Sequence, residues 1–347
     1  MKLGLAIGYS GAELRLPMER ILLAERLGYD SLWTAEAYGS DAISPLAYIA
    51  ALTTRIRLGT GIMQLAGRTP AMAAMQAATV DALSGGRVIA GLGVSGPQIV
   101  EGWYGQPWGK PYYRIRDYVQ IMRKIFAREE PVSHQGREIS LPYTGEGALG
   151  IGKPLKSILH TNPKLPIWLG TGTESNVKLT AELADGWLPL GFVPGSMQTY
   201  RPWLEEGFRR AGGGKSLKDF EIQASTTVTI TDDVRAAFRT MKPQIALYVG
   251  GMGHRDKNFH NDMMVRRGYG DAAKSIQELY LAGRKGEAME AIPDEYCDEM
   301  ALAGTPARIR ERYRAWEDAG ATGLTIRTDQ DEALELMAEI AQAEPVA

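Results

Sequence analysis

The sequence predicts an α/β fold, a (β/α)₈ TIM barrel, and two features of the chain support this fold class. Short apolar segments alternate with longer amphipathic segments over almost all of the 347 residues, which is the pattern of parallel β/α units. Eight of the short segments have the length and composition of buried strands. No internal repeat, low-complexity tract or linker interrupts this order, so we expect a single domain over residues 1–347.

The eight expected strands are rich in apolar and β-branched residues and are bounded by turn residues. They are Leu3–Gly8, Ser31–Glu36, Ile56–Gln64, Arg87–Val94, Pro166–Gly172, Gly186–Val193, Glu221–Thr231 and Gly323–Arg327. Between them, residues 14–28 and 112–126 have the clearest helical spacing, with apolar side chains at three- and four-residue intervals.

Two segments are longer than ordinary connections in such a barrel. Residues 129–164, rich in glycine and proline, form an insertion after the fourth strand, and residues 233–303 form a mostly helical excursion before the eighth. Long loops in compact enzymes are commonly lids or binding loops, and a barrel's site lies at the carboxyl ends of its strands. We therefore hypothesise that residues 129–164 are a lid.

Composition narrows the classes of partner. The formal net charge is −2 and the chain has a single cysteine, Cys297. The charge argues against nucleic acid or an anionic membrane, and the lone cysteine fits a reducing compartment. No apolar run reaches the roughly 18 residues of a membrane span, and the first residues do not have the pattern of a signal peptide. We expect a cytoplasmic protein that acts on a small molecule.

The segment GGRVIAGLGVSG, residues 85–96, contains the G-x-G-x-x-G spacing of a dinucleotide-binding turn. That turn normally opens a Rossmann unit and has an acidic residue about 20 positions on, at a strand end. Here three β/α units come first, and Asp117 falls within a helical pattern. A Rossmann protein is thus the weaker interpretation, and we expect these glycines to serve a tight turn or a close contact.

Several segments resemble the luciferase-like monooxygenase and reductase superfamily. In TPAMAAMQAATVDALSGGRVIAGLGVSG (69–96), a helix ending in LSGGR leads into a strand ending in GLG. GYDSLWTAEAY (28–38) and TRIRLGTGIMQL (54–65) are similar to the family's second and third strands, and residues 165–189 to its fifth and sixth. The chain most resembles the members that use the deazaflavin coenzyme F420. This resemblance implies a TIM barrel, F420 as coenzyme and a homo-oligomer, specifically a homodimer.

The resemblance also implies a place for the deazaflavin ring. Several relatives have a non-prolyl cis peptide in the third strand, which forms a bulge beneath the ring. The matching pair in this chain is Gly61-Ile62. Tyr9 and Gln64 lie near the ends of the first and third strands, where their polar tips would meet the ring.

A phosphate site is implied after the fourth and fifth strands. The first segment is Gly93-Val94-Ser95-Gly96, and the second is Gly170-Thr171-Gly172-Thr173-Glu174-Ser175, which leads directly into a helix. Backbone N–H groups at a helix N-terminus bind phosphate, and the hydroxyls add donors. The alternative is ordinary capping, in which Thr173 or Ser175 bonds to its own helix.

Glu36 is the candidate catalytic residue. Several F420-using relatives have an Asp-His pair where this sequence has Glu36-Ala37. A carboxylate at the end of a barrel strand can transfer protons, whereas the alternative is a structural carboxylate. We expect no metal site, because none of the four histidines has a partner at i+4.

Taken together, the resemblance implies a coenzyme F420-dependent oxidoreductase, a dehydrogenase or reductase. It would transfer a hydride between the deazaflavin and a small organic substrate. One alternative is an FMN-dependent two-component monooxygenase of the same superfamily. Another, of a different class, is a non-catalytic coenzyme-binding protein on the same fold.

Overall fold

The structure, a computed structural model, describes residues 1–160, 162–255 and 257–345. Among these residues, eight parallel strands close into a ring in which each pairs with the next along the chain and the last pairs with the first. They are β1 (Lys2–Gly8), β2 (Ser31–Thr34), β3 (Arg57–Thr60), β5 (Val88–Gly93), β8 (Ile167–Thr171), β9 (Gly186–Pro189), β10 (Glu221–Ile230) and β12 (Gly323–Arg327). The prediction of a (β/α)₈ barrel is confirmed, and the Rossmann alternative is wrong.

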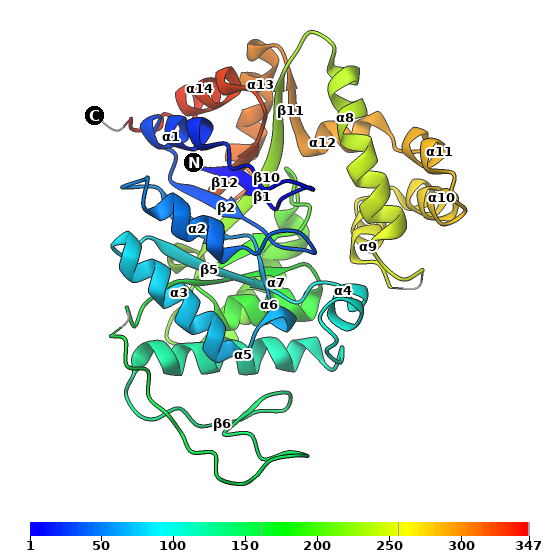
Figure 1. Cartoon of the computed structure of the whole chain (residues 1–347). Helices are drawn as coiled ribbons and strands as arrows, with labels where there is room; N and C mark the ends of the chain where they lie inside the picture. The colour runs from blue at the N-terminus through cyan, green and yellow to red at the C-terminus, as the bar shows by residue number, and fades with distance from the viewer. Residues whose placement is uncertain (161, 256, 346–347) are drawn as a thin grey trace.

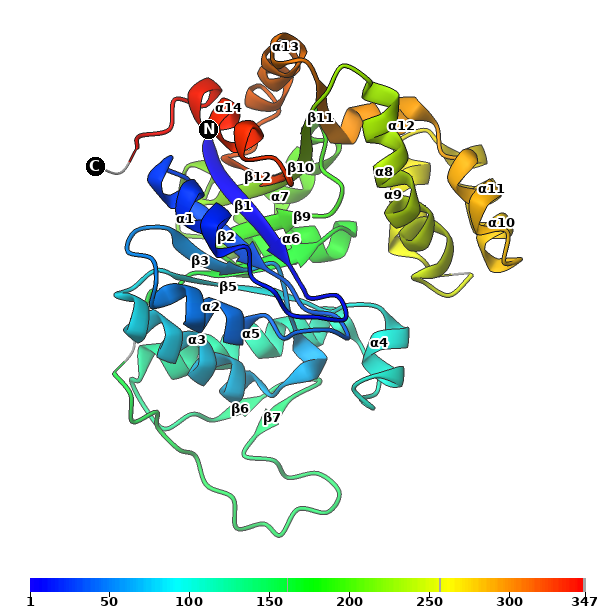
Figure 2. The same ribbon diagram turned by 45° about the horizontal axis from the view of Figure 1, so that its top comes forward.

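Helices surround the ring (Figures 1 and 2). They are α1 (Met18–Arg26), α2 (Ile43–Ala50), α3 (Pro70–Ser84), α5 (Pro111–Ala127), α6 (Glu174–Leu183), α7 (Met197–Ala211), α13 (Pro306–Glu317) and α14 (Asp331–Ile340). Short elements lie in the connections: η1 (Leu65–Gly67), α4 (Pro97–Gly102) and η2 (Leu217–Asp219). None of the helices in the described ranges is both long and apolar enough to cross a membrane.

Local chemistry fixes where helix α3 begins and ends. The Thr69 hydroxyl accepts a hydrogen bond from the amide of Met72 at 3.3 Å, and proline occupies the first helical position. The helix ends at Gly85, whose φ of +71° a side chain would disfavour. Arg87 directly precedes β5, and its guanidinium donates to the Ala50 carbonyl at 3.0 Å. The LSGGR segment thus joins α3 to the barrel.

The barrel interior is filled at one end and hollow at the other. Trp33 and Trp168 pack against each other inside it, with ring centroids 5.2 Å apart and ring planes tilted by 37°, and Ile89 packs against them. Towards the carboxyl ends of the strands, the inward positions carry small residues: Ala6, Gly8, Ala35, Gly61, Gly93, Gly170, Gly172 and Ser225. Side chains at these positions normally fill a TIM barrel in layers, so their small size leaves a cavity.

The third predicted strand, Ile56–Gln64, is divided in two. β3 ends at Thr60, and β4 (Met63–Gln64) follows and pairs with β5. The peptide bond between Gly61 and Ile62 is cis. The position of the cis peptide is confirmed, and the bulge points Ile62 towards the cavity.

The segment before the eighth strand forms a helical layer beside the barrel, drawn in yellow and orange in Figure 1. It contains α8 (Val234–Ala246), η3 (Leu247–Gly251), α9 (Phe259–Arg266), α10 (Gly270–Leu281), α11 (Lys285–Glu290) and α12 (Asp294–Met300). Its buried side chains form a hydrophobic cluster of their own. It ends in β11 (Ala301–Gly304), which pairs with the distal half of β10. The sequence analysis missed this strand.

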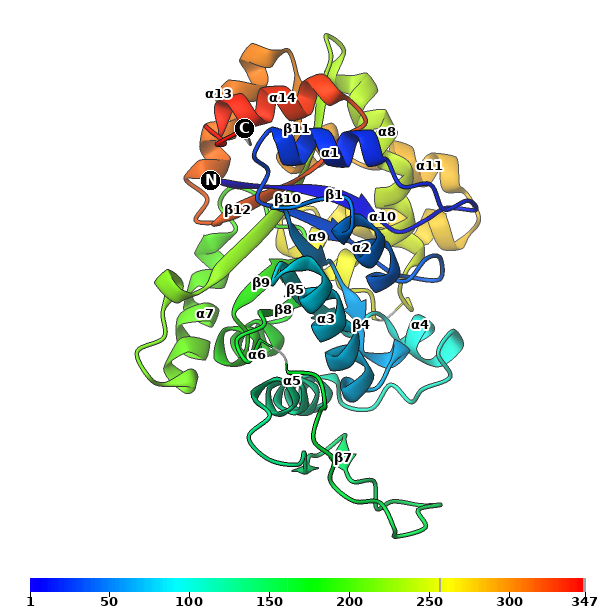
Figure 3. The same cartoon turned by 60° about the vertical axis from the view of Figure 1, so that its left-hand side comes forward.

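Within 129–164, the described residues 129–160 and 162–164 form an arm on the outside of the barrel (Figure 3). They include the hairpin of β6 (His134–Gln135) and β7 (Ser140–Leu141). The buried Asp117 of α5 holds the hairpin, because its carboxylate accepts from the amides of Glu138 at 2.7 Å and Ile139 at 3.0 Å. The arm is therefore attached to the outer face of a helix.

Candidate active site

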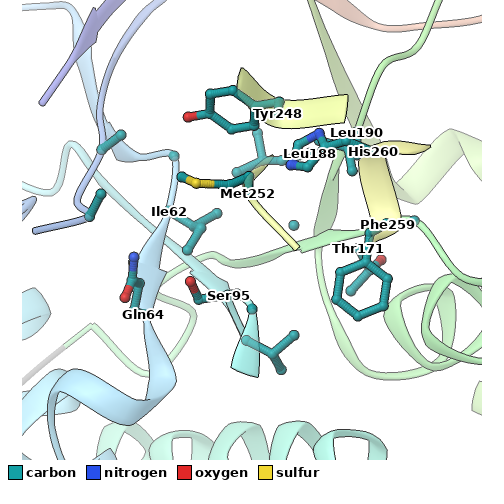
Figure 4. A pocket seen from close by; sticks show the side chains of 18 of the residues that line it. Ile62, Gln64, Ser95, Thr171, Leu188, Leu190, Tyr248, Met252, Phe259 and His260 are labelled. Carbon is teal, nitrogen blue, oxygen red and sulfur yellow. The ribbon is translucent and has the colours of Figure 1, made fainter. Parts of the chain in front are cut away.

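A cavity of about 450 Å³ opens at the carboxyl ends of the strands (Figure 4). It is lined by all but two of the residues that the sequence analysis proposed for the site. Those that line it are Tyr9, Glu36, Gly61, Ile62, Gln64, Gly93, Val94, Ser95, Gly96, Gly170, Thr171, Gly172 and Thr173. The fold thus brings together residues from the first, second, third, fourth and fifth predicted strands and their exits.

Glu174 and Ser175 do not line the cavity. They occupy the first turn of α6, where Glu174 pairs with Lys178 at 2.5 Å, with more than half of its side chain exposed. Successive helical residues point about 100° apart, so the cavity receives Thr173 and Asn176 but not the two residues between them. These two assignments are not supported by the geometry.

Ile62 explains two of the glycines. A Cβ added to Gly93 would lie 2.8 Å from the Ile62 side chain, and one added to Gly170 would lie 2.9 Å from it. Both glycines are therefore needed to seat Ile62 in the wall of the cavity. Gly91 serves a different contact, because its Cβ would lie 1.8 Å from the Thr60 carbonyl oxygen. Close packing thus explains the first two glycines, Gly91 and Gly93, of the spacing that resembles a dinucleotide fingerprint.

Gln64 presents a free acceptor at the cavity. Its Nε2 donates to the Glu36 backbone carbonyl at 2.9 Å, which orients the amide. Its Oε1 is buried and has no hydrogen-bond partner among the described residues. A buried polar atom without a partner is costly, so a ligand N–H group would satisfy it.

Glu36 is fully engaged in hydrogen bonds. Its carboxylate receives both terminal nitrogens of Arg68 at 2.8 Å, the amide of Ala42 at 3.1 Å and the amide of Gln64 at 2.6 Å. A carboxylate has about four lone-pair sites, so all of them are used. The geometry favours the structural alternative: Glu36 positions the turn that carries Gln64.

One end of the cavity lies at the N-terminus of α6, where the sequence analysis expected a phosphate site. Thr173 is the N-cap of this helix, but its side chain makes no capping hydrogen bond, so the capping alternative does not apply to it. Arg266 of α9 reaches the same loop and donates to the Gly172 carbonyl at 3.4 Å. The Thr171 hydroxyl is instead hydrogen-bonded within the protein, to the Thr180 hydroxyl at 2.8 Å. This end offers amides, one hydroxyl and a guanidinium.

The other wall comes from the helical layer, which the sequence analysis did not assign to the site. The cavity is lined by Tyr248 of η3, by Met252 directly after η3, and by Phe259 and His260 of α9 (Figure 4). The Asn258 side chain fixes their arrangement, because it accepts from the His260 amide and donates to the Tyr248 carbonyl, both at 3.0 Å. The sequence analysis placed these residues within the mostly helical excursion of 233–303 and named none of them as a site residue.

Two ionisable groups in this wall are shifted by burial. Burial lowers the pKa of His260 to about 4, so its imidazole is neutral at pH 7. Its ring meets that of Tyr248 edge to face, with centroids 4.6 Å apart. Burial and a hydrogen bond to Tyr9 raise the pKa of Tyr248, which keeps its hydroxyl protonated.

The arm is not the lid. None of the described residues between 129 and 164 lines the cavity. The arm follows a helix and precedes a strand, whereas the site is built from segments that follow strands. The lid hypothesis is wrong, and the helical layer covers the site instead.

The comparisons with known proteins agree with this fold. Residues 2–323 match the family described as luciferase-like monooxygenase. The chain belongs to this family. It is 49% identical over 328 residues, 94% of each chain, to a Mycobacterium tuberculosis protein named provisionally as a coenzyme F420-dependent oxidoreductase.

Two solved structures share this fold. The coenzyme F420-dependent tetrahydromethanopterin reductase from Methanopyrus kandleri superposes with a TM-score of 0.80 at 23% identity, over 99% of both chains. A type II Baeyer–Villiger monooxygenase of Pseudomonas putida, in complex with FMN, gives 0.69 at 18% identity over 100% of this chain and 99% of that one. The 49% identical relative confirms the prediction of an oxidoreductase at the level of enzyme class. The non-catalytic alternative is set aside.

Proposed function

We propose that this family member is a coenzyme F420-dependent oxidoreductase that transfers a hydride to or from a small organic substrate. The observation that carries the proposal is that one cavity is lined both by Gln64, whose buried Oε1 has no partner among the described residues, and by a helix N-terminus whose capping hydroxyl is unused. A ring N–H group and a phosphate are the complementary groups. The 49% identical relative supports F420 over other flavin-like coenzymes.

The residues present fit such a coenzyme. Thr173, Asn176 and Arg266 would hold its phosphate, since helix N-termini and guanidinium groups favour anions. Gln64 would accept a hydrogen bond from the deazaflavin ring, and Ile62 would support that ring. When bound, F420 would supply a carbon that donates or accepts a hydride, with little reactivity towards oxygen.

The protein's own contribution is to exclude water and to keep His260 and Tyr248 uncharged. Ile62, Leu188, Leu190, Met252 and Phe259 line the cavity with apolar surface, which strengthens polar interactions inside it. His260 stays neutral, so a ring nitrogen can accept a hydrogen bond from a substrate hydroxyl.

Titration of the purified protein with F420 and with FMN, each oxidised and reduced, tests the proposal. We expect F420 to bind at least about 100-fold more tightly than FMN, and Thr173→Val to weaken F420 about tenfold through the lost hydroxyl donor. Ser175→Ala, outside the cavity, is the matched control and should leave the affinity unchanged. Tight binding of FMN alone would support the FMN-dependent monooxygenase, for which the FMN-bound structure is the precedent.

Three further features belong to the same proposal. We propose a cytoplasmic enzyme, a single domain over residues 1–347, and a homodimer. Exposed Met72 and Met75 on the outer face of α3 support an association surface, with 47% and 55% of their surfaces exposed. Light scattering would give the mass in solution, and a single calorimetric transition would support one domain.

A further inference from the structure

The cavity has a second polar wall. β12 and β1 lie three or four places round the ring from β5 and β8, so they stand opposite the loops proposed to hold the phosphate. Thr325 of β12 points inward, because its hydroxyl accepts from the Gln223 side chain at 3.0 Å inside the barrel. Side chains alternate along a strand, so Arg327, two residues on, faces the same side and lines the cavity.

Arg327 has no counterion among the residues that the structure describes. It is the last residue of β12 and is exposed, and none of the carboxylates in the described ranges forms an ion pair with it. Arg57, at the other end of the barrel, contrasts with it, because Asp30 and Glu221 neutralise its guanidinium. Arg327 therefore presents an unused charge at the site.

The surroundings of Arg327 add neutral donors. The Tyr248 hydroxyl is hydrogen-bonded to Tyr9, and Arg327 is close enough to act electrostatically on Tyr248. Ser225 of β10 lines the same wall. Among the described lining residues the only carboxylate is Glu36, which Arg68 neutralises. This wall is therefore positive and rich in hydroxyl groups.

We propose that this wall binds a carboxylate of the substrate through Arg327, so that the enzyme acts on a small organic acid. The inference rests on the proposed function and specifies the substrate class of that site. A guanidinium binds a carboxylate through two parallel hydrogen bonds. One guanidinium with neutral hydroxyls matches a singly charged carboxylate better than a doubly charged phosphate, which draws more cations.

The test compares two probes of the same shape, benzoate and benzamide. Their dissociation constants are measured by calorimetry on coenzyme-free and F420-loaded protein. The wild type should bind benzoate more tightly than benzamide. Arg327→Gln should weaken benzoate about 10- to 100-fold, as for a lost charge-assisted hydrogen bond, and change benzamide less than about twofold.

Two variants serve as controls. Arg327→Lys keeps the charge and should retain part of the preference for benzoate. Arg26→Gln removes one positive charge from an exposed site on α1 and should change neither probe, because exposed charges at a distance are screened.

Three outcomes would overturn the inference: equal affinity of the wild type for the two probes, equal weakening of both by Arg327→Gln, or a loss of F420 affinity in that variant with benzoate unaffected. The last would mean that Arg327 serves the coenzyme's acidic tail. Failure of F420 to bind the wild type would overturn the proposed function instead. The benzoate preference of the coenzyme-free protein would still decide the role of Arg327.

Discussion

At the residue scale, the contact between Ile62 and Gly170 makes a specific prediction. Gly170→Ala puts a methyl 2.9 Å from the Ile62 side chain and should lower the free energy of unfolding by about 1–3 kcal/mol, as overpacking does. In the Ile62→Ala background this cost should largely vanish. Urea unfolding measures both. Gly102→Ala, with open space around the new methyl, is the control, and an undiminished cost in the Ile62→Ala background would contradict the prediction.

Glu36 gives a second prediction at this scale. Glu36→Gln leaves the Arg68 guanidinium, whose side chain is only 10% exposed, without its counterion. Losing one partner of a buried pair costs about 3–5 kcal/mol, so we expect urea unfolding to show a loss of that size. A much smaller loss is expected for Glu339→Gln, because the Glu339 carboxylate pairs with Arg310 at an exposed site. Unchanged stability with abolished turnover in Glu36→Gln would support proton transfer by Glu36.

Individual site residues were predictable where a position in the fold requires one particular type of residue. Gly61-Ile62 and Gln64 were identified because the resemblance places a bulge and a polar tip at fixed positions of a strand. Glu174 and Ser175 were wrongly assigned to the site, because the sequence alone does not show which way each side chain of a helical turn points. His260 and Arg327 had no local signal, since their roles depend on which wall the chain brings to the cavity.

At the scale of elements, the arm allows a direct test of where the lid is. Ile151 and Ile158 are 81% and 93% exposed and lie on the outside of the barrel. Replacing both with serine should leave F420 affinity within about twofold, because neither contacts the cavity. Met252→Ala, in the wall of the site, should weaken F420 several-fold through lost apolar contact. Weaker binding in the arm variant alone would restore the lid hypothesis.

The eight barrel strands were predictable from the sequence, whereas β11 was not. All eight barrel strands were expected from apolar runs bounded by turn residues, and each is present. β11 was missed because ALAG is short and weakly β-forming. It becomes a strand only by pairing with the part of β10 that extends beyond β9. Such pairing is a tertiary effect that local sequence does not encode.

At the scale of the whole molecule, two units of different construction share the site. The barrel supplies its glycines, the cis peptide and Gln64, and the helical layer supplies Tyr248 and His260. The layer has a separate hydrophobic cluster and is joined to the barrel through β11. Binding in the cavity therefore contacts both units, and a ligand bound there should stabilise their association.

The stability of the whole molecule should depend on the charge of His260. Its pKa is about 4 in the folded protein and about 6.5 in the unfolded chain. Between these values the unfolded state binds more protons, so the free energy of unfolding rises with pH. The contribution is fully present above about pH 6.5 and is lost as the pH falls towards 4, by at most about 3 kcal/mol.

Urea unfolding at several pH values from 4 to 7 measures this dependence. His260→Gln should flatten the curve in that window, because glutamine does not titrate. His160→Gln, an exposed position in the arm, should leave the curve of the wild type unchanged. If both variants kept the wild-type slope, other groups would dominate the acid sensitivity, and His260 would not be held neutral by its place between the helical layer and the barrel.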